Sequence, residues 1–170
     1  MIDRVIPIAF FNEHTLGVIP MIVETTRFGK IELLEENIYS FVKGIPGFEE
    51  YTKFAGIDIE GTPFSHLQSV ENGDLALIVV DPFVFYSTYE FQLPDPVVQE
   101  LEIETPEHIN IRCVVTVRDS LEKATVNLLA PIVLNIKSKK GKQVVLHQSD
   151  YTTKHPLISS VKSDPPGKEG

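Results

Sequence analysis

The chain has 170 residues, 42% of them hydrophobic, which is enough for one domain to bury a core without a metal or a disulfide. Its 24 acidic and 15 basic side chains give a net charge of -9, which repels nucleic-acid phosphates and speeds encounter with basic partners. The single cysteine excludes an internal disulfide and gives no sign of an oxidising compartment.

Residues 1–20 lack the alternating apolar pattern that begins at Met21, and they are predicted to be an appended segment, an upstream start or a flexible arm. The apolar stretch at 6–11 is too short to span a membrane, and it lacks the basic flank and the cleavage site of a signal peptide. We therefore expect a cytoplasmic protein. At the other end, residues 159–170 have almost no apolar pattern and are predicted to be a disordered tail, which leaves 21–158 as the domain.

The domain begins with short strands. Two runs, 22–28 and 30–34, are joined at Gly29, where a tight turn is expected, and a third run covers 37–42. Gly44-Ile-Pro-Gly47 comes next, and it favours a type II turn because Pro46 fixes φ while Gly47 supplies a positive φ.

The middle of the chain mixes predicted helices and strands. A short helix is predicted from Glu49 to about Ala55, with Gly56 ending it. Residues 75–80 are apolar on both faces, which predicts a central strand covered on both sides. In the aromatic run 81–91, strand-like alternation would bury half of the side chains and leave the others exposed.

A second short helix is predicted to start at Asp95, with this residue as N-cap and Pro96 as the first helical residue. The clearest strand is 109–117, where Ile109, Ile111, Cys113, Val115 and Val117 share one face and polar side chains lie on the other.

Runs at 124–129, 131–136 and 143–147 complete the domain, and the last two flank a hairpin turn over 138–142 carried by Gly141. Short strands with a turn signal about every ten residues predict a barrel or a sandwich.

Signatures of catalysis are weak. None of the five histidines has a second histidine or a cysteine at metal-ligand spacing, and neither a phosphate-binding glycine loop nor a nucleophile elbow is present. Cys113 lies in an apolar run and is interpreted as a small core residue. No catalytic, cofactor-binding or metal-binding residue is predicted.

Two alternatives remain open. Clustered carboxylates such as Glu71 and Asp74 could serve a small hydrolase, although most acidic residues fall at turns, where solvent is the expected partner. The lysine hairpin at 137–142 could make the chain a direct RNA-binding module, although it lacks the interleaved aromatic side chains of such surfaces.

An ordered set of segments carries a resemblance over about four fifths of the chain. The segments are Thr26-Arg-Phe-Gly29, Phe41-Val-Lys-Gly-Ile-Pro-Gly-Phe-Glu49, Pro63-Phe64, Leu67-Gln-Ser69, Leu75 to Pro82, Asn127 to Asn135, and Gly141 through Gln143-Val-Val to Tyr151. In this set the chain resembles the bacterial flagellar assembly factor FliW family. Residues 1–20 are not part of the resemblance.

The resemblance implies a mainly β fold, a small antiparallel β-barrel-like domain with one or two short helices. It implies a protein, monomeric when alone, that binds flagellin and the RNA-binding translational regulator CsrA. Binding to CsrA would relieve repression of flagellin translation, and accumulating flagellin would occupy the protein and free CsrA. The resemblance favours an allosteric action on CsrA, while the sequence leaves open whether the action is allosteric or competitive.

A surface of this kind would combine acidic side chains with a few apolar anchors. The partner-binding candidates are Phe48, Gln68, Ser69, Glu71, Asp74, Asp81, Phe83 and Tyr89. For Gly44, Pro46, Gly47, Asn127 and Pro131, the alternative interpretation is that the turns themselves require these residues.

Overall fold

The computed structural model describes residues 19–158, so the predictions for residues 1–18 and for the tail over 159–170 lie outside it. Two short helices are present among these residues, α1 (Pro82–Phe85) and α2 (Asp95–Glu100), with 3-10 turns at Glu35–Asn37, Pro106–His108 and Leu121–Lys123. The strands are β1 (Met21–Thr25), β2 (Gly29–Leu33), β3 (Ile38–Ser40), β4 (Lys53–Asp58), β5 (Phe64–Ser69), β6 (Ala76–Val80), β7 (Ile109–Thr116), β8 (Thr125–Val126), β9 (Ile132–Asn135), β10 (Lys140–Gln143) and β11 (His155–Pro156).

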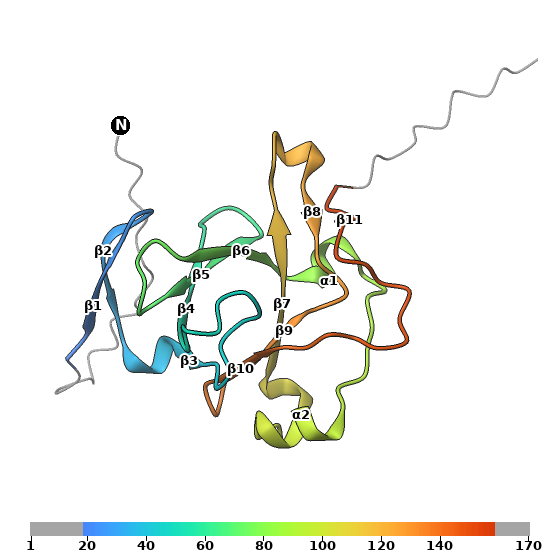
Figure 1. The fold of residues 1–170 in the computed structure, drawn as a ribbon, viewed down its shortest axis with the longest axis horizontal. Coiled ribbons are helices and arrows are strands. Elements are labelled where there is room, and N and C mark those ends of the chain that lie inside the picture. The colour runs from blue at the N-terminus through green and yellow to red at the C-terminus, as the bar shows by residue number, and fades with distance from the viewer. Residues whose placement is uncertain (1–18, 159–170) are drawn as a thin grey trace, which may run out of the picture.

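Seven of these strands close into a barrel in the order β7-β6-β5-β4-β3-β10-β9, with β9 pairing back onto β7 (Figure 1). Every pair in the ring is antiparallel except β3 with β10, which is parallel. Closure removes the open edges that a sheet of this size would otherwise expose. The predicted β-barrel-like fold is therefore confirmed, with one parallel pair in place of a fully antiparallel ring.

The register decides which side chains enter the lumen. In β4 and β5, Phe54 lies opposite Ser69 and Gly56 lies opposite Leu67, so alternate residues of both strands face inward. The resulting lumen core contains Phe41, Ile45, Phe54, Leu67, Leu75, Val79, Ile132 and Leu134.

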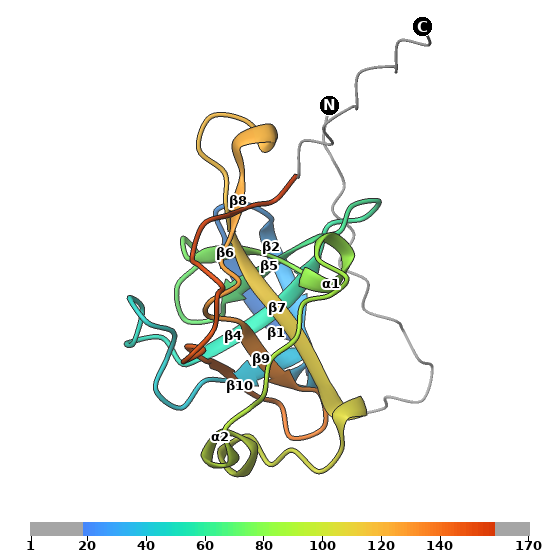
Figure 2. The same ribbon diagram turned by 90° about the vertical axis from the view of Figure 1, so that its right-hand side faces the viewer.

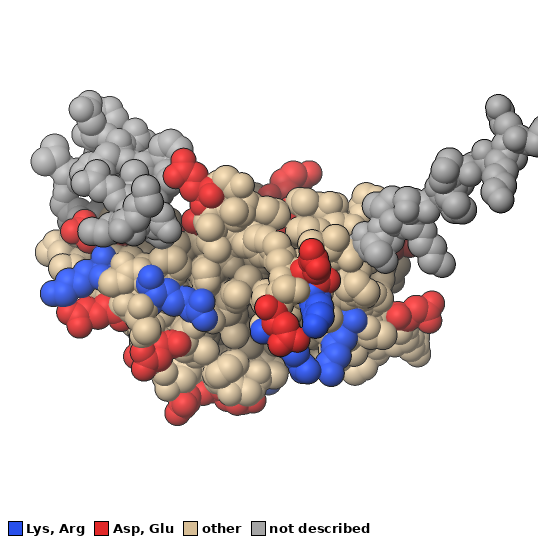
Figure 3. Space-filling model, turned by 90° about the horizontal axis from the view of Figure 1, so that it is seen from above, with Lys and Arg blue, Asp and Glu red and all other residues tan. Residues whose placement is uncertain are grey.

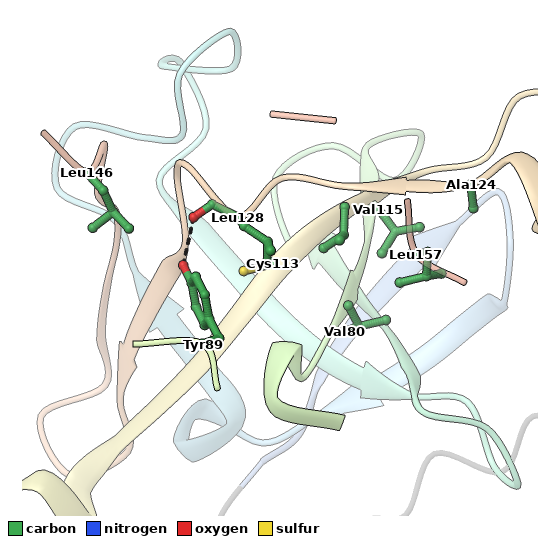
Figure 4. Packing of buried hydrophobic residues seen from close by; sticks show 9 residues of the cluster. Val80, Tyr89, Cys113, Val115, Ala124, Leu128, Leu146 and Leu157 are labelled. Atoms are coloured by element: carbon green, nitrogen blue, oxygen red, sulfur yellow. Dashed lines mark hydrogen bonds between the residues drawn. The ribbon is translucent and has the colours of Figure 1, made fainter. Parts of the chain in front are cut away.

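Three further clusters lie outside the ring, and one of them packs Val97 and Leu101 of the α2 region against Val133 and Val144. The β1–β2 hairpin packs Val23, Ile31 and Leu33 against Ala55 and Ile57 on the outer face of β4. The outer face of β7 packs Cys113 and Val115 beneath segments from other parts of the chain, including Tyr89, Leu128, Leu146 and Leu157 (Figure 4). Figure 2 shows the C-terminal segment with β11 running beside β8 on this side of the barrel.

The helix predicted over 49–55 is wrong, because a turn and then β4 occupy this stretch. Phe54 enters the lumen while Ala55 faces the β1–β2 hairpin, and this alternation is satisfied only by an extended strand. The helix at Asp95 is confirmed, although it includes Asp95 itself and its N-cap is Pro94. Helix α1 replaces the strand-like alternation expected over 81–91.

The glycine predicted to carry the β9–β10 turn does something else. Lys139 takes the left-handed conformation there, with φ of 58°, while Gly141 lies within β10. A Cβ atom on Gly141 would lie 2.5 Å from Cζ of Phe41. Gly141 is therefore required because the phenyl ring fills the space where a side chain would start. The strand predicted over 143–147 begins earlier, at Lys140, and ends at Gln143.

Two other strand predictions are confirmed with changes in burial. In β6, only Val79 and Val80 are buried, and Ala76, Leu77 and Ile78 are half-buried, so coverage on both sides holds for one end of the strand only. In β7, the polar face carrying Asn110 and Arg112 faces the lumen rather than solvent, as their pairing with the inward residues of β9 shows.

Candidate partner-binding surface

Two loops meet at one end of the barrel, the β3–β4 loop and the β5–β6 loop. The Glu71 carboxylate accepts hydrogen bonds from the backbone N–H groups of Thr52 at 2.6 Å and Lys53 at 3.0 Å. The side-chain amide of Asn72 donates to the Tyr51 hydroxyl at 3.0 Å. These bonds tie the two loops to each other, so the surface they form is held in place before any partner arrives.

The tip of the β3–β4 loop is the turn predicted from the sequence. The Phe48 N–H donates to the carbonyl of Ile45 at 2.7 Å, and Gly47 has the positive φ of 89° that this turn requires. Ile45 is 1% exposed and anchors the turn in the lumen core. Gly44 also has a positive φ, and a Cβ atom there would lie 2.6 Å from the Glu49 backbone, so the turn depends on it.

Apolar and acidic side chains are presented together at this end. Val42 is 68% exposed and Phe48 is 36% exposed, although both lie next to the fully buried lumen core in sequence. Glu49, Glu50 and Glu71 are exposed in the same two loops. We call these five residues the loop-end surface.

The eight candidates predicted from the sequence separate into three groups. Phe48 and Glu71 belong to the loop-end surface, and Asp74 lies beside it in the β5–β6 loop, where its carboxylate accepts a hydrogen bond from the Thr26 hydroxyl. Asp81 and Phe83 lie beyond the opposite end of β6. There the Asp81 carboxylate caps α1 by accepting from the Phe83 N–H at 2.9 Å, and the Phe83 ring is 44% exposed.

The remaining three candidates are corrected by the structure, because all of them are buried. Gln68 and Ser69 are fully buried, and Tyr89 is 4% exposed. The Gln68 amide donates to the carbonyl of Leu75 at 2.9 Å, while the Ser69 hydroxyl accepts from backbone N–H groups of the same loop. Tyr89 donates to the Leu128 carbonyl at 2.8 Å (Figure 4). Gln68 and Ser69 therefore support the β5–β6 loop from beneath, and Tyr89 belongs to the cluster on the outer face of β7.

Sequence reasoning did not select Val42, Glu49 or Glu50. Val42 was assigned to the strand run 37–42, in which apolar residues are expected to be buried, but β3 ends at Ser40. The one available signal was its position immediately before Lys43-Gly44, where a chain leaving a strand can expose its last apolar residue.

Reactive groups are scarce in the described part of the chain. Burial raises the pKa of the Cys113 thiol to about 12, so the thiol is protonated at neutral pH and is not a nucleophile. The carboxyl pKa values that depart from normal, those of Glu49, Glu104 and Glu107, are all lowered by hydrogen bonds, whereas a general acid needs a raised pKa. Within residues 19–158, histidine, cysteine and carboxylate side chains form no group that could hold a metal.

One histidine is buried with both ring nitrogens unpaired within the described part of the chain. His66 is 7% exposed, and neither ring nitrogen has a hydrogen-bond partner among residues 19–158. The ring packs edge-on against Phe28 at 5.0 Å between centroids. Burial and then the nearby Arg27 charge lower its pKa, so this histidine is neutral at physiological pH and behaves as a core residue.

The lysine hairpin is balanced by a facing row of acids. Lys137 pairs with Glu104, Lys140 with Glu102 and Lys142 with Glu100, which places the acidic row directly beside the basic one. Acidic and basic side chains are also interspersed on the face drawn in Figure 3. A phosphate backbone would have to displace these carboxylates, which weakens the RNA-binding alternative.

Among the helices of residues 19–158, none has the length and apolar character to cross a membrane.

The fold and this surface define the class of the protein: a small closed β-barrel that presents a preformed, partly apolar surface at one end. The model of the FliW protein family matches residues 22–157. The chain belongs to the FliW family, whose characterised relatives bear the name flagellar assembly factor.

Relatives cover nearly the whole length of the domain. The flagellar assembly factor FliW of Bacillus subtilis strain 168 is 44% identical over 138 residues, covering 81% of this chain and 96% of that protein. FliW of Thermoanaerobacter pseudethanolicus is 40% identical over 145 residues, covering 84% and 97%. A crystal structure of the flagellar assembly factor FliW matches with a TM-score of 0.77 at 37% identity, covering 82% of this chain and 98% of that chain.

Proposed function

We propose that this chain serves flagellum assembly as a partner switch: it binds flagellin, and it binds and antagonises CsrA, which relieves repression of flagellin translation. The role in assembly is suggested by the relatives' name, and the two partners by the family resemblance. The protein would act in the cytoplasm, as a monomer when alone, with no direct contact to nucleic acid or membrane.

The observation that carries the proposal is the loop-end surface. Val42 and Phe48 supply apolar area that can be desolvated by a partner, and three glutamates surround them. Cross-loop hydrogen bonds hold the surface in one shape, so little ordering entropy is lost on binding. The net charge of -9 adds attraction toward a basic protein such as an RNA-binding regulator.

A switch of this kind requires no catalytic group. Two partners that exclude each other from one protein are coupled by mass action, so the concentration of one sets the free concentration of the other. Phe83, capped by the half-buried Asp81, defines a second exposed location at α1, which allows the footprint to be tested by matched variants.

The test uses the full chain with purified flagellin and purified CsrA in isothermal titration calorimetry. Phe48→Ala should weaken binding of at least one partner by about tenfold or more, as truncation of a central aromatic anchor does. The matched control Phe83→Ala removes a ring of similar exposure, 44% against 36%, at the other location and should leave affinity unchanged. Glu50→Lys against the exposed control Glu122→Lys separates a local charge effect from a change in net charge.

A competition experiment tests the switch itself. Flagellin added to the preformed complex with CsrA should displace CsrA during gel filtration. A stable three-component complex would refute mutual exclusion, and failure of the wild-type chain to bind either protein would refute the proposal as a whole. Equal effects of Phe48→Ala and Phe83→Ala would remove the loop-end surface as the contact.

A further inference from the structure

The barrel lumen has a polar section as well as an apolar one. The apolar section is filled by the lumen core, but away from the loop end the inward positions of successive strands are Tyr39, Gly56, Asp58, Ser65, Asn110 and Arg112. Gly56 has no atom within 4 Å of the place where a Cβ would stand, so the strand leaves open space there. These residues line a cavity of about 180 Å³ that is open to solvent on one side.

Arg112 is the unusual member of this set, because strand residues that face a small barrel's interior are normally apolar. One guanidinium nitrogen donates to the side-chain oxygen of Asn110 and to the carbonyl of Ile111, the latter at 2.9 Å. Among residues 19–158, no carboxylate lies within 4 Å of this half-buried cation. Two hydrogen bonds to neutral oxygens orient the guanidinium without neutralising it.

A second cation lines the same cavity. Lys139 has a left-handed backbone conformation, and its ammonium lies 5.3 Å from the centre of the Tyr39 ring. Its hairpin neighbours Lys137, Lys140 and Lys142 are each paired with a glutamate, whereas Lys139 has no ion pair within the described part of the chain.

Two acidic residues also line this cavity, but within residues 19–158 neither of them forms an ion pair with Arg112 or Lys139. The Asp58 carboxylate accepts a hydrogen bond from the Ser65 hydroxyl at 2.7 Å, and Glu36 is exposed at the rim. The Tyr39 hydroxyl adds a neutral hydrogen-bonding group to the wall. A guanidinium, an ammonium and neutral hydroxyl and amide groups around one cavity match the requirements of an oxyanion, which needs several donors and at least one fixed positive charge.

We propose that the polar section of the lumen is a binding site for a small oxyanion, a phosphate or a short dicarboxylate, held by Arg112 with Lys139 at its side. The cavity volume of about 180 Å³ leaves room for an ion of this class. The site is separate from the loop-end surface and does not depend on the partner-switch proposal.

The experiment uses NMR of the ¹⁵N-labelled full chain during titration with sodium phosphate and, separately, sodium succinate at constant ionic strength. Saturable shifts of the Arg112 Nε–H and Asn110 side-chain amide signals are expected with at least one of the two. Phosphate alone points to a phosphate-bearing ligand, and succinate alone points to a carboxylate. Arg112→Gln should weaken this binding by about tenfold or more, the loss expected for a charge-assisted contact.

The matched control is Arg118→Gln, which removes the same charge at an exposed position beyond the end of β7 and should leave binding unchanged. Lys139→Asn tests the site if Arg112→Gln does not fold, because asparagine tolerates the left-handed backbone and only the cation is lost. It should weaken binding severalfold. An absence of saturable shifts with both ions, an unchanged affinity in Lys139→Asn, or an equal loss in Arg118→Gln, which would mean an adventitious ion only, overturns the proposal.

Discussion

Replacing Gly141 by alanine should destabilise the barrel through a collision inside the lumen. The new Cβ would lie 2.5 Å from Cζ and 2.7 Å from Cε2 of Phe41, and 2.9 Å from Cδ2 of Leu134. Phe41 is fully buried and packs edge-on against Phe54 at 5.3 Å between ring centroids, so the ring has little room to move away. Overpacking of this kind typically costs about 1–3 kcal/mol.

Because the collision has a named partner, a second substitution should relieve it. Phe41→Leu alone should cost about 1–2 kcal/mol by leaving a small cavity, less than the loss for a change from phenylalanine to alanine. In the double variant the leucine makes room for the alanine methyl, so the combined cost should fall below the sum by roughly 0.5–3 kcal/mol. Urea unfolding monitored by far-UV circular dichroism measures the free energy of unfolding of the wild type, the two single variants and the double variant.

Gly56→Ala is the matched control, since it adds a methyl group to the neighbouring part of the barrel where nothing lies within 4 Å. It should leave the free energy of unfolding unchanged or raise it by about 0.4–1 kcal/mol, because alanine lowers the conformational entropy of the unfolded chain. If Gly141→Ala were as harmless as Gly56→Ala, or if Phe41→Leu and Gly141→Ala were strictly additive, the steric explanation for this glycine would be refuted.

Three further outcomes are expected. Glu71→Ala should lower the free energy of unfolding by about 1 kcal/mol and speed amide exchange at Thr52 and Lys53, whose N–H groups lose their acceptor; unchanged exchange would contradict the clamp. Burial raises the pKa of the Cys113 thiol to about 12, so between about pH 9 and pH 12 the folded chain keeps a proton that the unfolded chain releases. The free energy of unfolding should therefore fall as the pH rises through this window, and it should fall less in Cys113→Ala. Urea unfolding of both proteins at pH 8 and pH 10 measures this difference. An equal change in the free energy of unfolding in wild type and Cys113→Ala would refute the prediction. Changing Glu100, Glu102 and Glu104 together to glutamine should release the lysine hairpin and raise RNA retention in a filter-binding assay above that of the wild-type chain, with a steep salt dependence. Equal retention would show that the acidic row does not mask the lysines.

Local pattern predicted most of the strands, because period-two alternation and turn chemistry act over a few residues. Positive φ at Gly29 and Gly47 was predictable from the requirements of tight turns. The pattern failed where another segment supplied the reason. Gly141 looks like a turn glycine in sequence, but its role depends on Phe41, a hundred residues earlier in the chain.

The candidate site shows the same division. Phe48 was predictable because a Pro-Gly turn precedes it and presents it at a loop tip. Gln68 and Ser69 were misplaced, since polar side chains are expected at surfaces and only the fold reveals that they satisfy the carbonyls and N–H groups of a bent loop. A buried polar residue that supports a loop and an exposed one that contacts a partner have the same local sequence signal.

Strand β7 shows why a closed barrel is harder to interpret from sequence than an open sheet. In an open sheet with one solvated face, alternation assigns the apolar face to the core and the polar face to water. Ring closure gives β7 two interiors: Cys113 faces an outer cluster covered by other segments, and Arg112 faces the lumen. The polar face is therefore half-buried, and its arginine acquires surroundings that differ from bulk water. The consequence is that the polar residues of a ring strand, and not only its apolar ones, report on what the barrel encloses.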